Sequence, residues 1–125
     1  LLSLYQGRSE DLWGMAEELA SYGVDYIIIK RGEAGQYLYD RSAQRRWEIP
    51  SYPIKVRNPT GVGDSFCGGF LAGYLKTYDP VEATLYGNIA AALTAEGTGA
   101  FYALEALPGL PEARIEMLRQ QVLEV

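Results

Sequence analysis

Apolar and polar positions change their period early in the chain. Between residues 12 and 20 the apolar side chains recur at the spacing of a helix, and Gly23 ends that pattern. Residues 24–29 then form a short, almost continuous apolar run rich in β-branched side chains, which predicts a strand buried on both faces of a sheet. After the turn sequence RGEAG, residues 36–40 alternate as the next strand would.

The middle of the chain predicts two more short strands and then a helix. Residues 47–49 and 54–56 are strand candidates, and Pro50 and Pro53 between them indicate an edge or a bend. From residue 64 the period is that of a helix to about residue 77, with apolar side chains predicted on one face at Phe66, Phe70, Leu71, Tyr74 and Leu75.

Two further helices complete the pattern. Asp79 followed by Pro80 is a helix-start pair, N-cap then N1, and the helix that follows is predicted to stop near Gly97. Pro111 opens a last helix, which we expect to be amphipathic and to run to Leu123. This order of strands and helices predicts an α/β fold in which helices cover a sheet.

Composition then narrows the classes of function. The 125 residues, 48% of them apolar, suffice for one globular domain with a packed core. The net charge of −5 argues against a nucleic-acid partner, and we interpret the basic cluster of Arg41, Arg45 and Arg46 as a solvated hairpin. No apolar stretch is long enough to span a bilayer, and the single cysteine, Cys67, cannot form an internal disulfide. We therefore expect a cytoplasmic protein with no membrane partner.

The stretch NPTGVGDSF carries the candidate chemistry. Gly61, Val62 and Gly63 stand directly before Asp64, where a helix should begin. The first backbone N–H groups of a helix are unpaired, and small residues let a bound ligand such as an anion approach them closely. A P-loop would need Lys and then Ser or Thr after Gly63, and the dinucleotide fingerprint would need another glycine three positions on. Both of these phosphate-binding motifs are therefore poor matches.

Two side chains in this stretch could act chemically. Ser65 is a weak candidate for the nucleophile of a hydrolase, because a serine nucleophile normally needs a histidine base and the chain contains no histidine. Asp64 could be a general base that takes a proton from a hydroxyl while the neighbouring amides hold a transferring phosphoryl group. The residues alone leave open the alternative that Asp64 only caps its helix and the glycines serve only the turn.

Residues 58–75, NPTGVGDSFCGGFLAGYL, resemble the second signature of the ribokinase-like (PfkB) carbohydrate kinases. That signature is Asp-Thr/Pro-Thr-Gly-Ala-Gly-Asp, followed by a helix of small residues with Gly-Gly-Phe. Residues 26–39, YIIIKRGEAGQYLY, are similar to the strand, Gly-x-x-Gly turn and strand that border the nucleotide in this family. Residues 86–100, YGNIAAALTAEGTGA, resemble the family's Ala-rich helix. The resemblance implies the C-terminal part of a three-layer α/β/α sandwich.

The resemblance also implies a role for each matching residue. Asp64 would be the catalytic base, and the amides of Gly61, Val62 and Gly63 would form the anion hole for the γ-phosphate of ATP, with Mg²⁺ bridging the phosphates. Contacts with the nucleotide, its adenine lying between two helices, are implied at Lys30, Gly32, Gly35, Thr60, Gly63 and Asn88. The alternative is a purely structural role, as a strand end, a turn or a helix-face amide.

One departure from the family pattern concerns a monovalent cation. The signature's first aspartate, associated in the family with a cation loop, is Asn58 here, which keeps an oxygen ligand but removes a charge. Thr60 and the loop around Gly99 could still offer oxygen ligands. Asn58, Thr60 and Gly99 are therefore the candidate ligands for K⁺.

The second departure is length. Family members are much longer, and their N-terminal part carries the sugar-binding signature, the lid and an N-x-x-E motif that organises Mg²⁺. We therefore expect residues 1–125 to be the C-terminal, nucleotide-binding portion of an ATP-dependent sugar or nucleoside kinase, which in its full length would act on a small sugar-like substrate and form a homodimer through the lid. The isolated chain would phosphorylate nothing by itself. The alternatives are a nucleotide-binding module and a structural remnant without catalysis.

Overall fold

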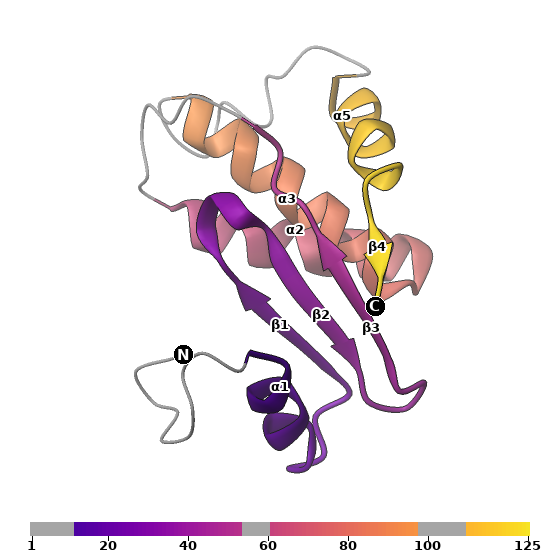
Figure 1. Cartoon of the computed structure of the whole chain (residues 1–125). Coiled ribbons are helices and arrows are strands. Elements are labelled where there is room, and N and C mark those ends of the chain that lie inside the picture. Colours follow the sequence, from indigo (N-terminus) through magenta and orange to yellow (C-terminus); the bar gives the residue numbers. More distant parts are fainter. Residues whose placement is uncertain (1–11, 54–60, 98–109) are drawn as a thin grey trace.

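A four-stranded antiparallel sheet forms the middle of the molecule (Figure 1). The computed structural model describes residues 12–53, 61–97 and 110–125. The strands lie in the order in which the chain makes them, as β1 (Tyr26–Lys30), β2 (Gln36–Asp40), β3 (Arg45–Ile49) and β4 (Leu123–Glu124). Three of these strands lie where the sequence predicts them, whereas the candidate strand at residues 54–56 lies outside the described residues.

Helices cover both faces of this sheet, as the sequence predicts. The helices are α1 (Leu12–Ala20), α2 (Val62–Thr77), α3 (Pro80–Glu96) and α5 (Leu110–Arg119), and a short 3₁₀ helix, η2 (Gly32–Ala34), joins β1 to β2. Helix α1 lies on one side of the sheet, and the other three lie on the opposite side (Figure 1). None of the described helices is long and apolar enough to cross a membrane.

Each face of the sheet has its own hydrophobic cluster. Ile27 and Ile29 of β1 pack with Met15 of α1 on one face. On the other face, the cluster contains residues of β2 and β3 together with residues of α3 and α5, namely Leu38, Trp47, Ile49, Leu85, Ile89, Leu93, Ile115 and Leu118. Ile28 packs against this second cluster, so β1 is in contact on both faces, as its apolar run predicts.

Helix α3 begins as its sequence predicts. The Asp79 side chain, in extended backbone, accepts hydrogen bonds from the amides of Val81 at 2.8 Å and Glu82 at 3.5 Å. Pro80 occupies the first helical position, where its missing N–H costs nothing. The cap and the proline therefore fix the start of the helix that forms one wall of the site described below.

The apolar side chains of α2 do not all share one face. Phe66 is buried, whereas Leu71 and Leu75 are 61% and 69% exposed. The side of α2 that meets α3 carries glycines instead: a Cβ added to Gly69 or Gly73 would lie 2.7 Å from atoms of α3. Because the two backbones approach this closely, the small residues occupy the interface and the two leucines face outward.

The last helix is shorter than the predicted span to Leu123. Helix α5 ends at Arg119, and Leu123–Glu124 instead pairs with β3 as β4. Arg45 of β3 donates two hydrogen bonds, of 2.8 and 2.6 Å, to the carboxylate of Glu124. The prediction was wrong because it counted helical periodicity alone, whereas β3 offers unpaired backbone groups that a second strand satisfies.

The basic cluster is matched by acids within the described structure. Arg41 forms an ion pair with Asp25 at 2.8 Å, and the Arg46 guanidinium lies 3.8 Å from the carboxylate of Glu17. With Arg45 bound to Glu124, each cation of the hairpin has an acidic neighbour.

The Arg45–Glu124 pair makes the docking of β4 dependent on pH. Hydrogen bonds from Arg45 lower the pKa of Glu124 below its ordinary value of 4.5. A lowered pKa means that the pair stabilises this docking above the ordinary carboxylate range and that the contribution is lost as the pH falls through the lowered pKa. We expect an NMR titration to give a lower pKa for Glu124 in the wild type than in Arg45→Gln. Arg41→Gln is the control; equal values in all three proteins would contradict the prediction.

Candidate functional site

The first turn of α2 presents backbone N–H groups that have no partner among the described residues. Gly61 precedes the helix in the left-handed conformation, with φ of 77°, and the first helical hydrogen bond runs from the Ser65 amide to the Gly61 carbonyl at 2.9 Å. The amides of Val62, Gly63 and Asp64 donate no hydrogen bond to any described residue. These three N–H donors lie at the positive end of a helix and are unpaired within the described residues. Such an arrangement is typical of an anion-binding site.

Lys30 adds a positive charge at the same place. It is the last residue of β1, and its Nζ lies 3.4 Å from the position that a Cβ on Gly63 would take. The same Nζ lies 5.2 Å from the centre of the Phe66 ring, one turn further along α2. A side chain at position 63 would therefore crowd the ammonium group, and glycine keeps the space between Lys30 and the helix end open.

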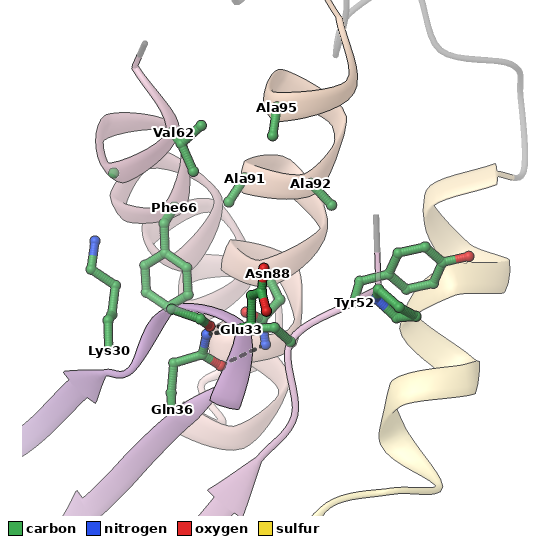
Figure 2. A pocket seen from close by; sticks show the side chains of 14 residues that line it. Lys30, Glu33, Gln36, Tyr52, Val62, Phe66, Asn88, Ala91, Ala92 and Ala95 are labelled. Atoms are coloured by element: carbon green, nitrogen blue, oxygen red, sulfur yellow. Dashed lines mark hydrogen bonds between the residues drawn. The ribbon is translucent and has the colours of Figure 1, made fainter. Parts of the chain in front are cut away.

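A cavity of about 770 Å³ opens beside this helix end. Figure 2 shows the labelled side chains around it, with Lys30, Glu33 and Gln36 from the β1–β2 region, Val62 and Phe66 from α2, and Asn88 from α3. Small apolar side chains of α3, at Ala91, Ala92 and Ala95, line it as well. Volumes of a few hundred to about 1,000 Å³ with mainly apolar walls and few polar groups are typical of small-molecule sites.

The structure brings most of the predicted contact residues to this cavity. Its lining includes Lys30, Gly32, Val62, Gly63 and Asn88. Gly35, Gly61 and Asp64 are not part of the lining. Three predicted ligands, Asn58, Thr60 and Gly99, lie outside the described residues.

Asp64 lies next to the cavity rather than in its wall. It follows Gly63 directly and is exposed, and its carboxylate forms no hydrogen bond or ion pair with any described residue. Asp64 occupies the first turn of α2, whereas the N-cap position is held by Gly61, which has no side chain to accept a bond. Within the described structure Asp64 does not cap its helix, and its exposed carboxylate forms no hydrogen bond there.

Gly35 has a structural role. Its φ of 92° and ψ of −150° lie in a region open almost only to glycine. A Cβ there would lie 2.1 Å from the carbonyl oxygen of Ile49. The Arg31 amide donates to the Gly35 carbonyl at 2.8 Å, which closes the turn between β1 and β2. Gly35 therefore holds the shape of the turn that carries Gly32 to the cavity.

Ser65 is engaged with α3. Its Oγ accepts a hydrogen bond of 2.7 Å from Oγ1 of Thr94, which is buried. No side chain able to act as a base contacts Ser65 among the described residues. The geometry gives the weak hydrolase alternative no activated nucleophile.

Two polar residues beside the cavity were missed from the sequence, Gln36 and Ser51. Gln36 is buried and accepts a hydrogen bond of 2.7 Å from Nδ2 of Asn88 (Figure 2). Ser51 donates to the Gly32 carbonyl at 2.9 Å. The available signal was that Gln36 occupies an inward-facing position of β2, two residues before the buried Leu38, where an apolar residue is usual.

Comparison with known proteins agrees with this geometry. The model of the pfkB family of carbohydrate kinases matches residues 4–107. A cytidine kinase from Thermococcus kodakarensis is 42% identical over 68 residues, which cover 54% of this chain and 24% of that protein. An uncharacterized sugar kinase from Archaeoglobus fulgidus is 36% identical over 92 residues, 74% of this chain and 36% of that protein.

A solved structure shows the same fold. The nucleoside kinase of Methanocaldococcus jannaschii, an archaeal member of the ribokinase family, superposes with a TM-score of 0.67 at 31% identity and covers 88% of this chain. The match spans 36% of that structure, and the matches to the two relatives span 24% and 36% of those proteins. The predicted ribokinase-like fold is confirmed.

Proposed function

The chain belongs to the pfkB family of carbohydrate kinases, and we propose that it is the nucleotide-binding portion of a kinase that transfers the γ-phosphoryl group of ATP to a hydroxyl of a small sugar-like substrate. One observation carries the proposal: the amides at the start of α2, which donate to no described residue, lie beside the Lys30 ammonium at one cavity. Two independent sources of positive potential at one point favour a phosphate group.

In this proposal the amides of Gly61, Val62 and Gly63 face the transferring phosphoryl group. Negative charge on its oxygens is then held by donors that are already in position, and Lys30 adds a full charge. The Asp64 amide is a further donor in the same turn. Because these donors are fixed by the helix, they need no rearrangement during the reaction.

Asp64 acts on the other partner of the reaction. Its carboxylate accepts the proton of the acceptor hydroxyl as that oxygen attacks the γ-phosphorus, and the bond to the ADP oxygen breaks. Its position outside the cavity wall fits this role, since the acceptor must approach the γ-phosphate from the side opposite ADP.

We propose that Mg²⁺ would enter the site bound to the phosphates of the nucleotide. Within the described part of the chain there is no group of three or more His, Cys, Asp or Glu side chains that could hold a metal ion. When bound, Mg²⁺ neutralises part of the phosphate charge. The amides and Lys30 would bind the phosphoryl oxygens that do not contact Mg²⁺.

We propose that the acceptor is a sugar or a nucleoside, the classes named for the similar kinases. The chain matches 24% to 36% of the length of those proteins, and we propose that the acceptor-binding residues lie in the part of a full-length kinase that this chain does not match. The 125-residue chain is then expected to bind nucleotide without transferring phosphate.

Titration calorimetry with ATP and Mg²⁺ tests the nucleotide site in this chain. We expect binding by the wild type and an affinity lowered by about 10-fold in Lys30→Met, because removing one charge-assisted contact costs roughly 1.5 kcal/mol. Lys76→Met, which removes a lysine near the other end of α2, should leave the affinity unchanged. No binding by the wild type would leave only the structural remnant, and equal loss in both variants would show a nonspecific charge effect.

A further inference from the structure

Three side chains and two backbone carbonyls beside the cavity form one directed chain of hydrogen bonds. At one end, the Ser51 hydroxyl donates to the carbonyl of Gly32 at 2.9 Å, and Ser51 Oγ accepts from Nε2 of Gln36 at 3.3 Å. At the other end, Nδ2 of Asn88 donates to the carbonyl of Pro50 at 3.2 Å and to Oε1 of Gln36 at 2.7 Å. Gln36 therefore joins the two ends.

The two backbone carbonyls set the direction of this chain, because a carbonyl can only accept. The Gly32 carbonyl requires Ser51 to donate, so the Ser51 oxygen is left to accept from the NH₂ group of Gln36. The Pro50 carbonyl requires Asn88 to turn its NH₂ group inward, toward the oxygen of Gln36. The orientation of both amides follows from their partners and from no other assumption.

The consequence is an acceptor without a partner at the cavity. Both N–H bonds of the Asn88 amide are used, and its Oδ1 accepts no hydrogen bond from any described residue. Oδ1 of Asn88 is also not among the fully buried, unpaired side-chain atoms of the described structure, so part of its surface is accessible. Since Asn88 lines the cavity, Oδ1 is the amide atom that a bound molecule meets.

Resting on the nucleotide site proposed above, we infer that Gln36 is a positioning residue that selects the nucleotide base. Gln36 holds Asn88 so that only an acceptor faces the cavity, and a base that presents an N–H donor there is favoured. A 6-aminopurine such as adenine offers that donor, whereas a 6-oxopurine places an oxygen against Oδ1.

The rest of this wall suits a flat ring. Ala91, Ala92 and Ala95 follow Asn88 on the cavity side of α3, and their small apolar side chains leave room for a base to lie against the helix. Glu33 is the carboxylate on the lining, but it belongs to the exposed turn η2, where water competes for its oxygens. Asn88 is 5% exposed, so a mismatched group opposite its oxygen has little water to replace the lost bond.

The test compares three nucleotides on this chain by titration calorimetry with Mg²⁺: ATP, inosine triphosphate and purine riboside triphosphate. They share the phosphates and ribose and differ at position 6 of the base, which carries NH₂, O or H; the 6-oxo base also carries a proton on the adjacent N1. We expect ATP to bind about 10-fold more tightly than inosine triphosphate, with the 6-hydrogen analogue between them. Equal affinities for ATP and inosine triphosphate would overturn this inference and leave the nucleotide site standing, whereas no binding of any nucleotide would overturn both.

Gln36→Met tests the positioning role. It keeps the length and burial of the side chain but removes the shorter of the two hydrogen bonds that hold the Asn88 NH₂ group inward. Only the 3.2 Å hydrogen bond to the Pro50 carbonyl is then left, so the amide turns its NH₂ group toward a 6-oxo group at a lower cost. We expect the preference for ATP over inosine triphosphate to fall to less than about 3-fold. If the variant only lost packing, it would bind both nucleotides more weakly by the same factor, and the ratio of their affinities would stay at the wild-type value. That result would overturn the role of Gln36. Gln120→Met, at an exposed position after α5, is the matched control and should keep the wild-type ratio.

Discussion

Replacing Asp64 by Asn in the full-length kinase is expected to lower turnover by at least about 100-fold, the usual effect of losing a general base. Asparagine keeps the size and polarity of the side chain but cannot take the proton from the acceptor hydroxyl. Because the Asp64 carboxylate contacts no other described residue, the substitution breaks no contact that holds this part of the fold. Steady-state kinetics with ATP and the acceptor measure the loss.

Nucleotide binding separates the loss of the base from damage to the site. Removing a negative charge beside the phosphates should leave the affinity of this chain for ATP equal or slightly tighter, whereas a disturbed helix start would weaken it. Asp25→Asn removes an exposed carboxylate that is paired with Arg41 instead. Turnover that survives in Asp64→Asn, or falls equally in both variants, would contradict the assignment of Asp64.

Replacing Gly35 by Ala is expected to destabilise the chain by about 3 kcal/mol or more. The added Cβ would lie 2.1 Å from the Ile49 carbonyl oxygen, and the backbone at position 35 has a φ of 92° that an L-residue rarely adopts. Relief requires movement of residues 49 and 50, and the carbonyl of Pro50 holds Asn88. The free energy of unfolding, from urea denaturation, measures the effect.

Gly32→Ala provides the matched control in the same turn. Gly32 also has a positive φ, of 60°, but a Cβ there would meet no atom within 4 Å. Its cost is therefore only that of the left-handed backbone, about 1 kcal/mol. If the two variants lost equal stability, the close approach of Gly35 to Ile49 would not be what matters.

The sequence predicted a helix boundary correctly where neighbouring residues determine that boundary. Asp79 and Pro80 place the start of α3 because a cap needs only neighbouring residues. The end of α5 could not be predicted in this way, since Glu124 is drawn to β3 by Arg45, which is distant in the sequence. The exposed position of Leu71 could not be predicted from the sequence either. The glycine side of α2 becomes its packed side only because α3 lies against it in the folded chain.

The candidate site was predictable where a motif carries it. The glycines before Asp64 indicated a helix start with open amides, and the structure has such amides within its described residues. The cation ligands proposed at Asn58, Thr60 and Gly99 stay a prediction. The inward-facing position of Gln36 in β2 was the one local signal for it, whereas its two partners could not be predicted because they come from α3 and from the segment after β3.

The glycine contacts between α2 and α3 have a mechanical consequence. A Cβ on Gly87 would lie 2.9 Å from the Phe66 carbonyl, so the backbones of the two helices are in close contact at this point. The Thr94–Ser65 hydrogen bond adds a second tie close to the open amides. We therefore expect α2 and α3 to move as one unit, so that the amides at the start of α2 and the Asn88 side chain of α3 keep their relative positions when a molecule binds.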